Sequence, residues 1–598
     1  MKIKLSDYVV QFIADHGVKH IFMVPGGGAM HLNDSVGHNK NITFICNHHE
    51  QASAMAAETY ARITENLGVA LVTTGPGATN AITGAAGAWL DSTPCLFISG
   101  QVKRADLIGD LGVRQNGVQE VDIVSLVKSI TKYAVTVMDP NKIRYHLERA
   151  VYLAKSGRPG PVWLDIPLDV QAAQIETDCL DGFKIAEVGP VDNNLAEQVK
   201  KTIELLNQAK RPVLFLGNGI RLSGAAKDIV SLVRKLNIPV LSTWLAMDLL
   251  SGSDELLIGR PGPVAPRGAN FALQNSDFLL TIGARLDNVV TGYAHDKFAR
   301  AAKKVMVDID LAELKKMRTK IDVPICADAK DFICELQKQS RSILPLERGD
   351  WLAKCSEWKK KYPVVLPEYR QEKLVSTYVF ADELSNALTS DDVIIPCSSG
   401  AGIEIFLLAF RAKQGQRVVN TTALGAMGNG LPACLGGCLA SGGKRTICVD
   451  GDGGVQLNIQ EFQTLSQLNL PIKIFILNNQ GYSSIRTSQS RYFKRLSGAD
   501  STSGMTLPDI KKIATSYGLK VMSITSQHDL AGQINKVLET PGTVVCEVLC
   551  PPDEPRAPSM MSLQKPDGTM VSKPLEDLWP FLEREEFLAN MLIPPLEE

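Results

Sequence analysis

The chain has 598 residues, of which 45% are hydrophobic and 21% charged, and its formal net charge is −1. This length exceeds what one hydrophobic core supports and predicts about three domains. A balanced charge without a basic block excludes binding to nucleic acid through an electropositive surface. The longest uncharged stretch, residues 66–90, is rich in Gly, Thr and Asn and therefore makes a poor membrane span. We expect neither nucleic acid nor a membrane as a partner.

The cysteines and the first residues indicate the compartment. Twelve cysteines occur without a Cys-x-x-Cys pair, and Cys46, Cys95, Cys448 and Cys546 lie in apolar, strand-like runs. Buried, reduced thiols are typical of proteins in a reducing compartment. The opening MKIKLSDYVV becomes amphipathic at once and does not resemble a signal peptide. We therefore expect a cytoplasmic protein.

Three segments alternate strand-like and helix-like patterns, which is typical of parallel sheets covered by helices. The predicted class is α/β, with three doubly wound parallel-sheet domains over residues 1–170, 193–345 and 365–550. The first and third segments look like two versions of one sheet design. Residues 551–598 form a C-terminal tail, in which DLWPFLEREEFLANML is expected to be one amphipathic helix.

The stretch from Gly451 to Gly481 carries the strongest chemical signal. Apolar runs before Asp450 and before Asn478 predict two buried strands, and the spacing of apolar residues between them predicts a helix. Polar residues just after these strands would lie at the carboxyl edge of a parallel sheet, where open α/β sheets bind ligands.

The residues after the two strands suit a magnesium ion and a diphosphate. Carboxylate and carbonyl oxygens are the ligands that Mg²⁺ prefers, and glycines let backbone N–H groups approach a phosphate. The alternative is that both segments are only tight turns. The candidate metal ligands are Asp452, Asn479 and the carbonyl of Gly481. The candidate diphosphate glycines are Gly451, Gly453 and Gly454.

The spacing of this stretch adds a resemblance to a known family. From Gly454 to Leu477 there are 24 residues, followed by Asn478–Asn479, and this resembles the thiamine-diphosphate signature of GDG with a later NN. HEQASAMAAETYAR, TTGPGATNAITGAAGAWLDSTP, GARLDNVVTG, VMVDID and LGAMGNGLPACLG follow the order of the acetolactate synthase (acetohydroxyacid synthase)-like family. The resemblance covers residues 1 to 550. It implies a pyrimidine-binding domain, a central domain of nucleotide or FAD type, and a diphosphate- and magnesium-binding domain.

The resemblance implies roles for individual residues. Glu50 matches the family glutamate that hydrogen-bonds the aminopyrimidine ring; a metal site at His48, His49 and Glu50 is disfavoured, because adjacent residues diverge around a helix. The second diphosphate loop lacks the Gln and His usual near Ala401, which leaves some phosphate contacts to the backbone alone. The further implied cofactor-binding residues are Asn80, Ser399, Gly400, Gly402, Gly425 and Met427.

The resemblance also extends to residues of the substrate pocket and of the central segment. Gln119 and Val118 align with a pair that lines the substrate pocket, and Gly27 would leave room above the thiazolium ring. Ser488 stands where the synthases carry a tryptophan, which opens space for a larger acceptor. The residues that resemble FAD ligands are Gly217, Gly219, Arg285, Asp310 and Asp328. Alternatively these positions are vestigial, because residues 260–262 lack the usual Met-His.

The resemblance implies a thiamine-diphosphate-dependent carboligase, a transferase that decarboxylates a 2-keto acid and transfers the acyl-anion equivalent to a carbonyl acceptor. Pyruvate is the expected donor, and the acceptor is a second pyruvate or a bulkier ketone such as an activated keto-sugar. One alternative is a simple 2-keto acid decarboxylase, and another is a non-catalytic binding or regulatory homologue. The cofactors are thiamine diphosphate, Mg²⁺ and FAD. The chain is expected to form a homodimer or homotetramer with active sites shared between chains.

Overall fold

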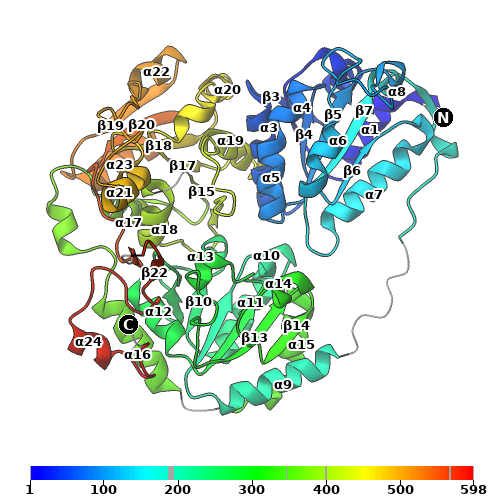
Figure 1. The fold of residues 1–598 in the computed structure, drawn as a ribbon. Coiled ribbons are helices and arrows are strands. Elements are labelled where there is room, and N and C mark those ends of the chain that lie inside the picture. Colours follow the sequence, from blue (N-terminus) through cyan, green and yellow to red (C-terminus); the bar gives the residue numbers. More distant parts are fainter. Residues whose placement is uncertain (1, 186–193, 346–347, 398–399, 565–566, 597–598) are drawn as a thin grey trace.

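The computed structural model describes residues 2–185, 194–345, 348–397, 400–564 and 567–596. These residues form three parallel six-stranded sheets, each covered by helices, and two small antiparallel ribbons (Figure 1). The α/β class with three parallel-sheet domains is therefore confirmed. No helix in the described part of the chain has the length and apolar character needed to cross a membrane.

The first sheet has the order β3-β2-β4-β5-β7-β6. Every residue of β4 is buried, which fits a central strand with helices on both faces. The strands are β2 (His20–Met23), β3 (Thr43–Cys46), β4 (Gly68–Val72), β5 (Cys95–Gln101), β6 (Tyr133–Thr136) and β7 (Val162–Pro167). The principal helices are α1 (Leu5–Asp15), α2 (Met30–His38), α3 (Glu50–Thr64), α5 (Ile82–Leu90) and α7 (Ile143–Lys155).

The third sheet has the order β16-β15-β17-β18-β20-β19. Counted from its own first strand this is 2-1-3-4-6-5, the same order as in the first sheet, so the two segments do share one design. The strands are β15 (Val393–Pro396), β16 (Arg417–Val418), β17 (Thr446–Gly451), β18 (Ile472–Asn478), β19 (Lys520–Ile524) and β20 (Val544–Leu549). The principal helices are α17 (Thr377–Ala387), α19 (Gly430–Ala440), α20 (Glu461–Leu468), α21 (Ser483–Tyr492) and α23 (Leu530–Glu539).

The central sheet has a different order, β11-β10-β9-β12-β13-β14. Counted within the domain this is 3-2-1-4-5-6, the order of dinucleotide-binding folds, whose ligands bind where the strand order reverses. The strands are β9 (Pro212–Leu216), β10 (Val240–Ser242), β11 (Leu257–Gly259), β12 (Phe278–Ile282), β13 (Lys303–Asp308) and β14 (Val323–Cys326). The principal helices are α9 (Leu195–Gln208), α11 (Ala226–Leu236), α12 (Arg267–Gln274), α14 (Leu311–Lys315) and α15 (Ala329–Lys338).

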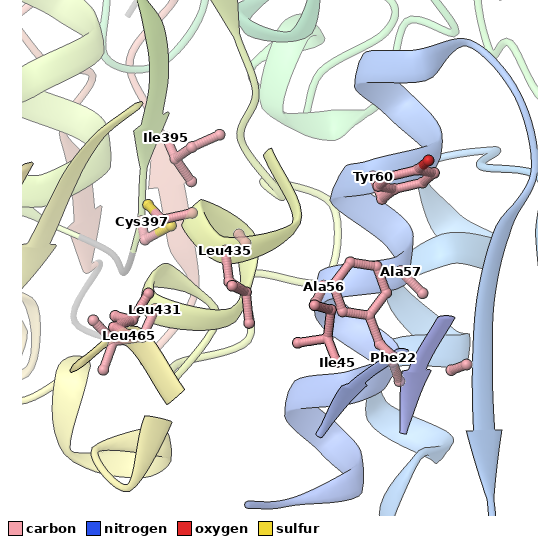
Figure 2. Packing of buried hydrophobic residues seen from close by; sticks show 14 of the residues in the cluster. Phe22, Ile45, Ala56, Ala57, Tyr60, Ile395, Cys397, Leu431, Leu435 and Leu465 are labelled. Atoms are coloured by element: carbon pink, nitrogen blue, oxygen red, sulfur yellow. The ribbon is translucent and has the colours of Figure 1, made fainter. Parts of the chain in front are cut away.

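The first and third domains are joined through α3 and α19, which pack against each other. Their small residues allow the backbones to approach closely, since a Cβ on Gly436 would lie 2.2 Å from the carbonyl oxygen of Ala56. Side chains of both domains form one buried cluster (Figure 2). The N-terminal and C-terminal domains of one chain are therefore held in a fixed mutual position.

Two expectations are wrong in detail. The tail does not form the expected helix over residues 577–592: within this described range only α24 (Arg584–Ala589) is α-helical, and the proline at 580 interrupts the expected run. The end of the tail lies beside the central domain (Figure 1). There the side-chain amide of Asn275 donates to the Asn590 carbonyl at 3.0 Å. Cys46 is exposed, not buried, because β3 is an edge strand; the other three cysteines are buried.

Candidate active site

Two loops at the carboxyl ends of β17 and β18 form the first part of the candidate site. These strands pair in parallel register, so the residues that follow them lie side by side. The carboxylate of Asp452 links the loops: Oδ1 accepts the Gly453 N–H at 2.8 Å, and Oδ2 accepts the Gly481 N–H at 3.0 Å. Asp452 and Gly481, two of the expected metal ligands, are therefore in direct contact.

Asn479 carries an unused acceptor in this loop. The residue is 7% exposed, and its Oδ1 has no hydrogen-bond partner in the described part of the chain. A buried polar atom without a partner is costly, which makes it a candidate ligand for an ion. Burial raises the pKa of Asp452 to about 6, and a cation beside it would favour the charged carboxylate. The donor set, one carboxylate with neutral oxygens, fits a hard cation such as Mg²⁺.

The hydroxyl groups of Ser483 and Ser484 lie beside Gly400, and the sequence analysis did not single them out. Gly400 has a φ of +69°, and a Cβ there would lie 2.8 Å from Ser484 Oγ and 2.9 Å from Ser483 Oγ. The Ser484 Oγ is buried without a hydrogen-bond partner among the described residues. Both serines begin α21, directly after the carboxyl end of β18, and this position is the signal that would have found them. Ser399 lies outside the described residues.

Two further glycines are required by close packing. A Cβ on Gly453 would lie 2.3 Å from the Tyr482 ring, and one on Gly402 would lie 2.3 Å from the carbonyl oxygen of Cys397. Larger residues at either position would displace the loops that contain Asp452 and Gly400. The remaining expected glycines are Gly451, which ends β17, and Gly454, which precedes a 3-10 turn over Val455–Asn458.

Glu50 begins α3 in the N-terminal domain. Its Oε2 accepts a hydrogen bond from the side-chain amide of Asn80 at 2.9 Å, so these two expected residues are brought together. His49 is the N-cap, and its Nδ1 accepts the Gln51 N–H at 3.0 Å. No group of three or more His, Cys, Asp or Glu residues in the described ranges is arranged to hold a metal, which argues against the metal alternative at His48–Glu50.

Three of the expected substrate-side residues lie in loops or turns of the N-terminal domain, and the fourth lies on a helix of the C-terminal domain. Gln119 has a φ of +64°, and its carbonyl oxygen would lie 2.1 Å from a Cβ on Gly75. The neighbouring Val118 is 84% exposed. Gly27 lies in a 3-10 turn, and a Cβ there would meet nothing within 4 Å. Ser488 lies on α21 of the C-terminal domain, where its hydroxyl donates to the Ile485 carbonyl at 3.0 Å.

The loop of residues 420–428 contains Gly425 and Met427 and connects β16 to α19. The Gly425 N–H donates to the Thr421 carbonyl at 2.8 Å, and Gly425 itself has a φ of +65° with open space around it. The loop borders a cavity of about 200 Å³ that Gly425 and Ala426 line together with central-domain residues. The loop therefore lies between the C-terminal and central domains.

A larger cavity of about 370 Å³ lies at the carboxyl ends of the central strands and shares lining residues with the smaller one. Gly219, Arg285 and Asp328, three of the expected FAD residues, line it. Arg285 has a φ of +57°, and its guanidinium donates to the Leu90 carbonyl at 3.1 Å. The cavity is thus bounded by the N-terminal domain as well as by the central sheet.

The other two expected FAD residues do not line this cavity. A Cβ on Gly217 would lie 2.0 Å from the Gly283 carbonyl oxygen, so this glycine serves the packing of β9 against the loop after β12. Asp310 caps α14 through the Ala312 N–H at 2.9 Å and forms an ion pair with Arg158 at 3.0 Å. Arg158 belongs to the N-terminal domain, so Asp310 contributes to the contact between the two domains.

Comparison with known proteins assigns this geometry to a family. The thiamine pyrophosphate enzyme N-terminal TPP binding domain matches residues 3–126, the central domain of these enzymes matches residues 199–336, and the C-terminal TPP binding domain matches residues 403–548. The chain belongs to the thiamine pyrophosphate enzyme family. The acetolactate synthase large subunit of Cyanidium caldarium is 32% identical over 557 residues, which cover 90% of this chain and 92% of the relative. Acetolactate synthase 1, chloroplastic, of Nicotiana tabacum is 33% identical over 574 residues, which cover 94% of this chain and 83% of the relative.

Membership of the thiamine pyrophosphate enzyme family confirms the expected resemblance and the expected cofactor, which is the same compound as thiamine diphosphate. The two TPP binding domains of the family correspond to the two sheets that share one strand order. The Asp452 loops lie in the C-terminal match and Glu50 lies in the N-terminal match. The candidate residues are thus divided between two TPP binding domains of the same design.

Proposed function

We propose that this thiamine pyrophosphate enzyme is a carboligase that decarboxylates a 2-keto acid, with pyruvate as donor, and joins the two-carbon unit to a carbonyl acceptor. The observation that carries the proposal is the contact between the Asp452 carboxylate and the Gly481 N–H, beside an Asn479 Oδ1 that has no hydrogen-bond partner among the described residues. Similarity to acetolactate synthases over at least 90% of the chain supports the reaction class.

Mg²⁺ would be held by Asp452, Asn479 and the Gly481 carbonyl, and these residues fit it because they offer only hard oxygen ligands. The diphosphate would lie between this ion and Gly400. There the hydroxyls of Ser483 and Ser484 would donate to phosphate oxygens, in place of the Gln and His that the family usually carries near Ala401. Ser484 Oγ is the better candidate because it has no partner among the described residues.

Thiamine diphosphate, when bound, supplies the electron sink that decarboxylation of a 2-keto acid requires. The protein would supply the proton chemistry through Glu50, whose carboxylate accepts from a ring nitrogen of the cofactor. The amide of Asn80 fixes that carboxylate at 2.9 Å, so its orientation does not depend on the cofactor. The carbonyl of Gly425 and the amide of Met427 would hold the opposite edge of the ring.

On the substrate side, Gln119 would donate its amide to a substrate carboxylate, and Gly27 leaves open space for it. Ser488 and Val118 would border the acceptor. A serine at 488 is small, so the acceptor is either a second pyruvate or a bulkier ketone.

The central cavity is proposed to bind FAD. Gly219, Arg285 and Asp328 line it, and its place at the reversal of the strand order suits a dinucleotide. The overall reaction has no net redox step, so the flavin would be structural. Purified protein should then be yellow and release FAD on denaturation; an active, colourless enzyme that added FAD does not affect would contradict this.

The working unit is proposed to be a homodimer or a tetramer of such dimers, with Glu50 of one chain serving the C-terminal domain of another. Support comes from apolar side chains that the single chain leaves exposed near these residues: Val118 at 84%, Leu457 at 49% and Ile485 at 43%. Mixing Glu50→Gln and Asp452→Ala chains tests this. A shared site should restore up to about a quarter of wild-type activity after random exchange. No recovery after confirmed exchange would show that each site is built within one chain.

The function is tested by supplying pyruvate with Mg²⁺ and thiamine diphosphate, first alone and then with aldehydes, ketones and nucleotide-linked keto-sugars, and identifying the products by mass spectrometry. We expect a carbon–carbon bond-forming product that the Glu50→Gln control does not make. Acetaldehyde as the only product would identify a decarboxylase. Absence of both turnover and cofactor binding would identify a non-catalytic homologue. A cytoplasmic location stays a prediction that rests on the sequence pattern of the cysteines, which contains no Cys-x-x-Cys pair.

A further inference from the structure

The helix α3 is linked to the loop of residues 420–428 near both ends of that loop, directly at one end and through Asn458 at the other. At one end, Arg62 Nη1 donates to the Asn420 carbonyl at 2.7 Å. At the other end, the side-chain amide of Asn458 donates to the Gly428 carbonyl and to Gln51 Oε1, both at 2.9 Å. Gln51 and Arg62 lie roughly 16 Å apart along the helix, so one rigid element of the N-terminal domain braces the whole loop.

The contact of Arg62 with the loop is its shortest polar contact. The carboxylates of Asp91 and Glu58 lie 3.5 Å and 3.7 Å from the same nitrogen, which is longer than a good hydrogen bond. The side chain of Arg62 is only 7% exposed, so the carbonyl it binds is desolvated as well. Arg417 adds a second link, because its Nη2 donates to the Arg62 backbone carbonyl at 3.0 Å. Arg62 therefore does more than neutralise acidic neighbours within its own domain.

The braced segment is short. Between the two anchors the described backbone makes one turn, closed by the Gly425 N–H and the Thr421 carbonyl at 2.8 Å. Leu424 packs toward Gly87 of α5, where a Cβ would lie 3.9 Å from Leu424 Cδ2. With both ends fixed and the turn internally bonded, the position of Gly425 follows from the position of α3.

We propose that Arg62 and Asn458 are positioning residues, which let the N-terminal domain set the place of Gly425 and Met427 in the C-terminal domain of its own chain. The inference rests on the proposed function insofar as that loop holds the pyrimidine ring. α3 then has two roles: Glu50 at its start contacts a cofactor directly, and Arg62 near its end acts through the loop.

The test compares amide hydrogen exchange in apo-protein. Because removing Arg62 alone would leave the buried Asp91 carboxylate without a nearby guanidinium, the first variant is Asp91→Asn with Arg62→Gln, which removes one charge of each sign. The second is Gln51→Ala, which leaves the buried charges intact. Arg144→Gln is the matched control, since Arg144 pairs on the surface with Glu148 at 2.7 Å. Thiamine diphosphate affinity is measured by tryptophan fluorescence in each.

We expect the amides of residues 420–428 to exchange faster in both variants while those of α3 remain as protected as in the control. The Kd for thiamine diphosphate should rise about tenfold in the double variant, as for the loss of one charge-assisted hydrogen bond. Unchanged loop exchange in both variants would overturn the inference. So would loop and α3 amides that exchange faster together, because that would indicate a purely structural role. A wild-type protein that binds no thiamine diphosphate would defeat the proposed function, while the exchange comparison would still decide this inference.

Discussion

Replacing Glu58 by Gln should remove a pH dependence of stability that the wild-type protein carries. The Glu58 side chain is buried in α3, and the nearby Asp91 carboxylate is buried as well, with Arg62 between them. Burial raises the pKa of Glu58 from 4.5 to about 8; Arg62 lowers it and Asp91 raises it further. Two carboxylates for one guanidinium mean that the folded protein holds a proton on Glu58 near neutral pH.

The raised pKa of Glu58 determines the direction and the size of the change in unfolding free energy with pH. The folded protein binds the proton more tightly than the unfolded chain, so the stabilisation is fully present below pH 4.5 and is lost as the pH rises through about 8. Between pH 6 and pH 8 the free energy of unfolding should fall by about 2 kcal/mol through this group. The Glu58→Gln variant should lack this component, because its amide does not titrate.

The assay is thermal unfolding of wild type and variant at pH 6, 7 and 8, followed by near-ultraviolet circular dichroism. Glu197→Gln serves as control, since Glu197 is an exposed glutamate on α9. At about 2–4 °C per kcal/mol for a domain of this size, the wild-type midpoint should fall by about 4–8 °C more than that of Glu58→Gln between pH 6 and pH 8. Equal pH dependence in the two proteins would refute the reasoning.

Three further predictions concern the cofactor and the acceptor. Asp452→Ala should abolish Mg²⁺-dependent binding of thiamine diphosphate in calorimetric titration, because a hard ligand is lost from a near-octahedral site; undiminished affinity would remove Asp452 from the metal site. Ser484→Ala should weaken cofactor binding roughly tenfold, the effect of one hydrogen bond to a charged group, whereas Ser490→Ala on the same helix should not; equal affinities would show that the Ser484 hydroxyl does not reach the diphosphate. Ser488→Trp should depress ligation to bulky acceptors more than pyruvate self-condensation, measured by product ratios. A parallel loss of both activities would mean that residue 488 does not border the acceptor.

Much of the fold was predictable because it depends on local patterns. The apolar runs before Asp450 and Asn478 form adjacent parallel strands, and this alone brings their following loops together. The tail helix is shorter than its amphipathic pattern predicts, because the pattern counts only apolar and polar positions and ignores the effect of the proline at 580. The exposure of Cys46 depends on strand order, which the composition of a strand does not encode.

The parts of the site that were not predictable depend on contacts between distant segments. Ser484 lies beside Gly400 although 84 positions separate them in the sequence. A serine and a glycine are too common in loops and turns for their sequence to predict this contact. Asn458 links Gln51 to Gly428 across two domains, and an asparagine in a turn has many simpler roles. Likewise, the ion pair between Asp310 and Arg158 depends on how the two domains pack, and the sequence around either residue does not predict it.

The brace between α3 and the loop of residues 420–428 has a genetic consequence. Arg62 lies in the N-terminal domain, on the same helix as Glu50, yet it supports a loop of its own chain's C-terminal domain. In a dimer with shared sites, damage to Arg62 and damage to Asp452 would fall on the same site. Alleles of Arg62 would then complement alleles of Glu50 and fail to complement those of Asp452, so the complementation map would divide α3 between its two ends.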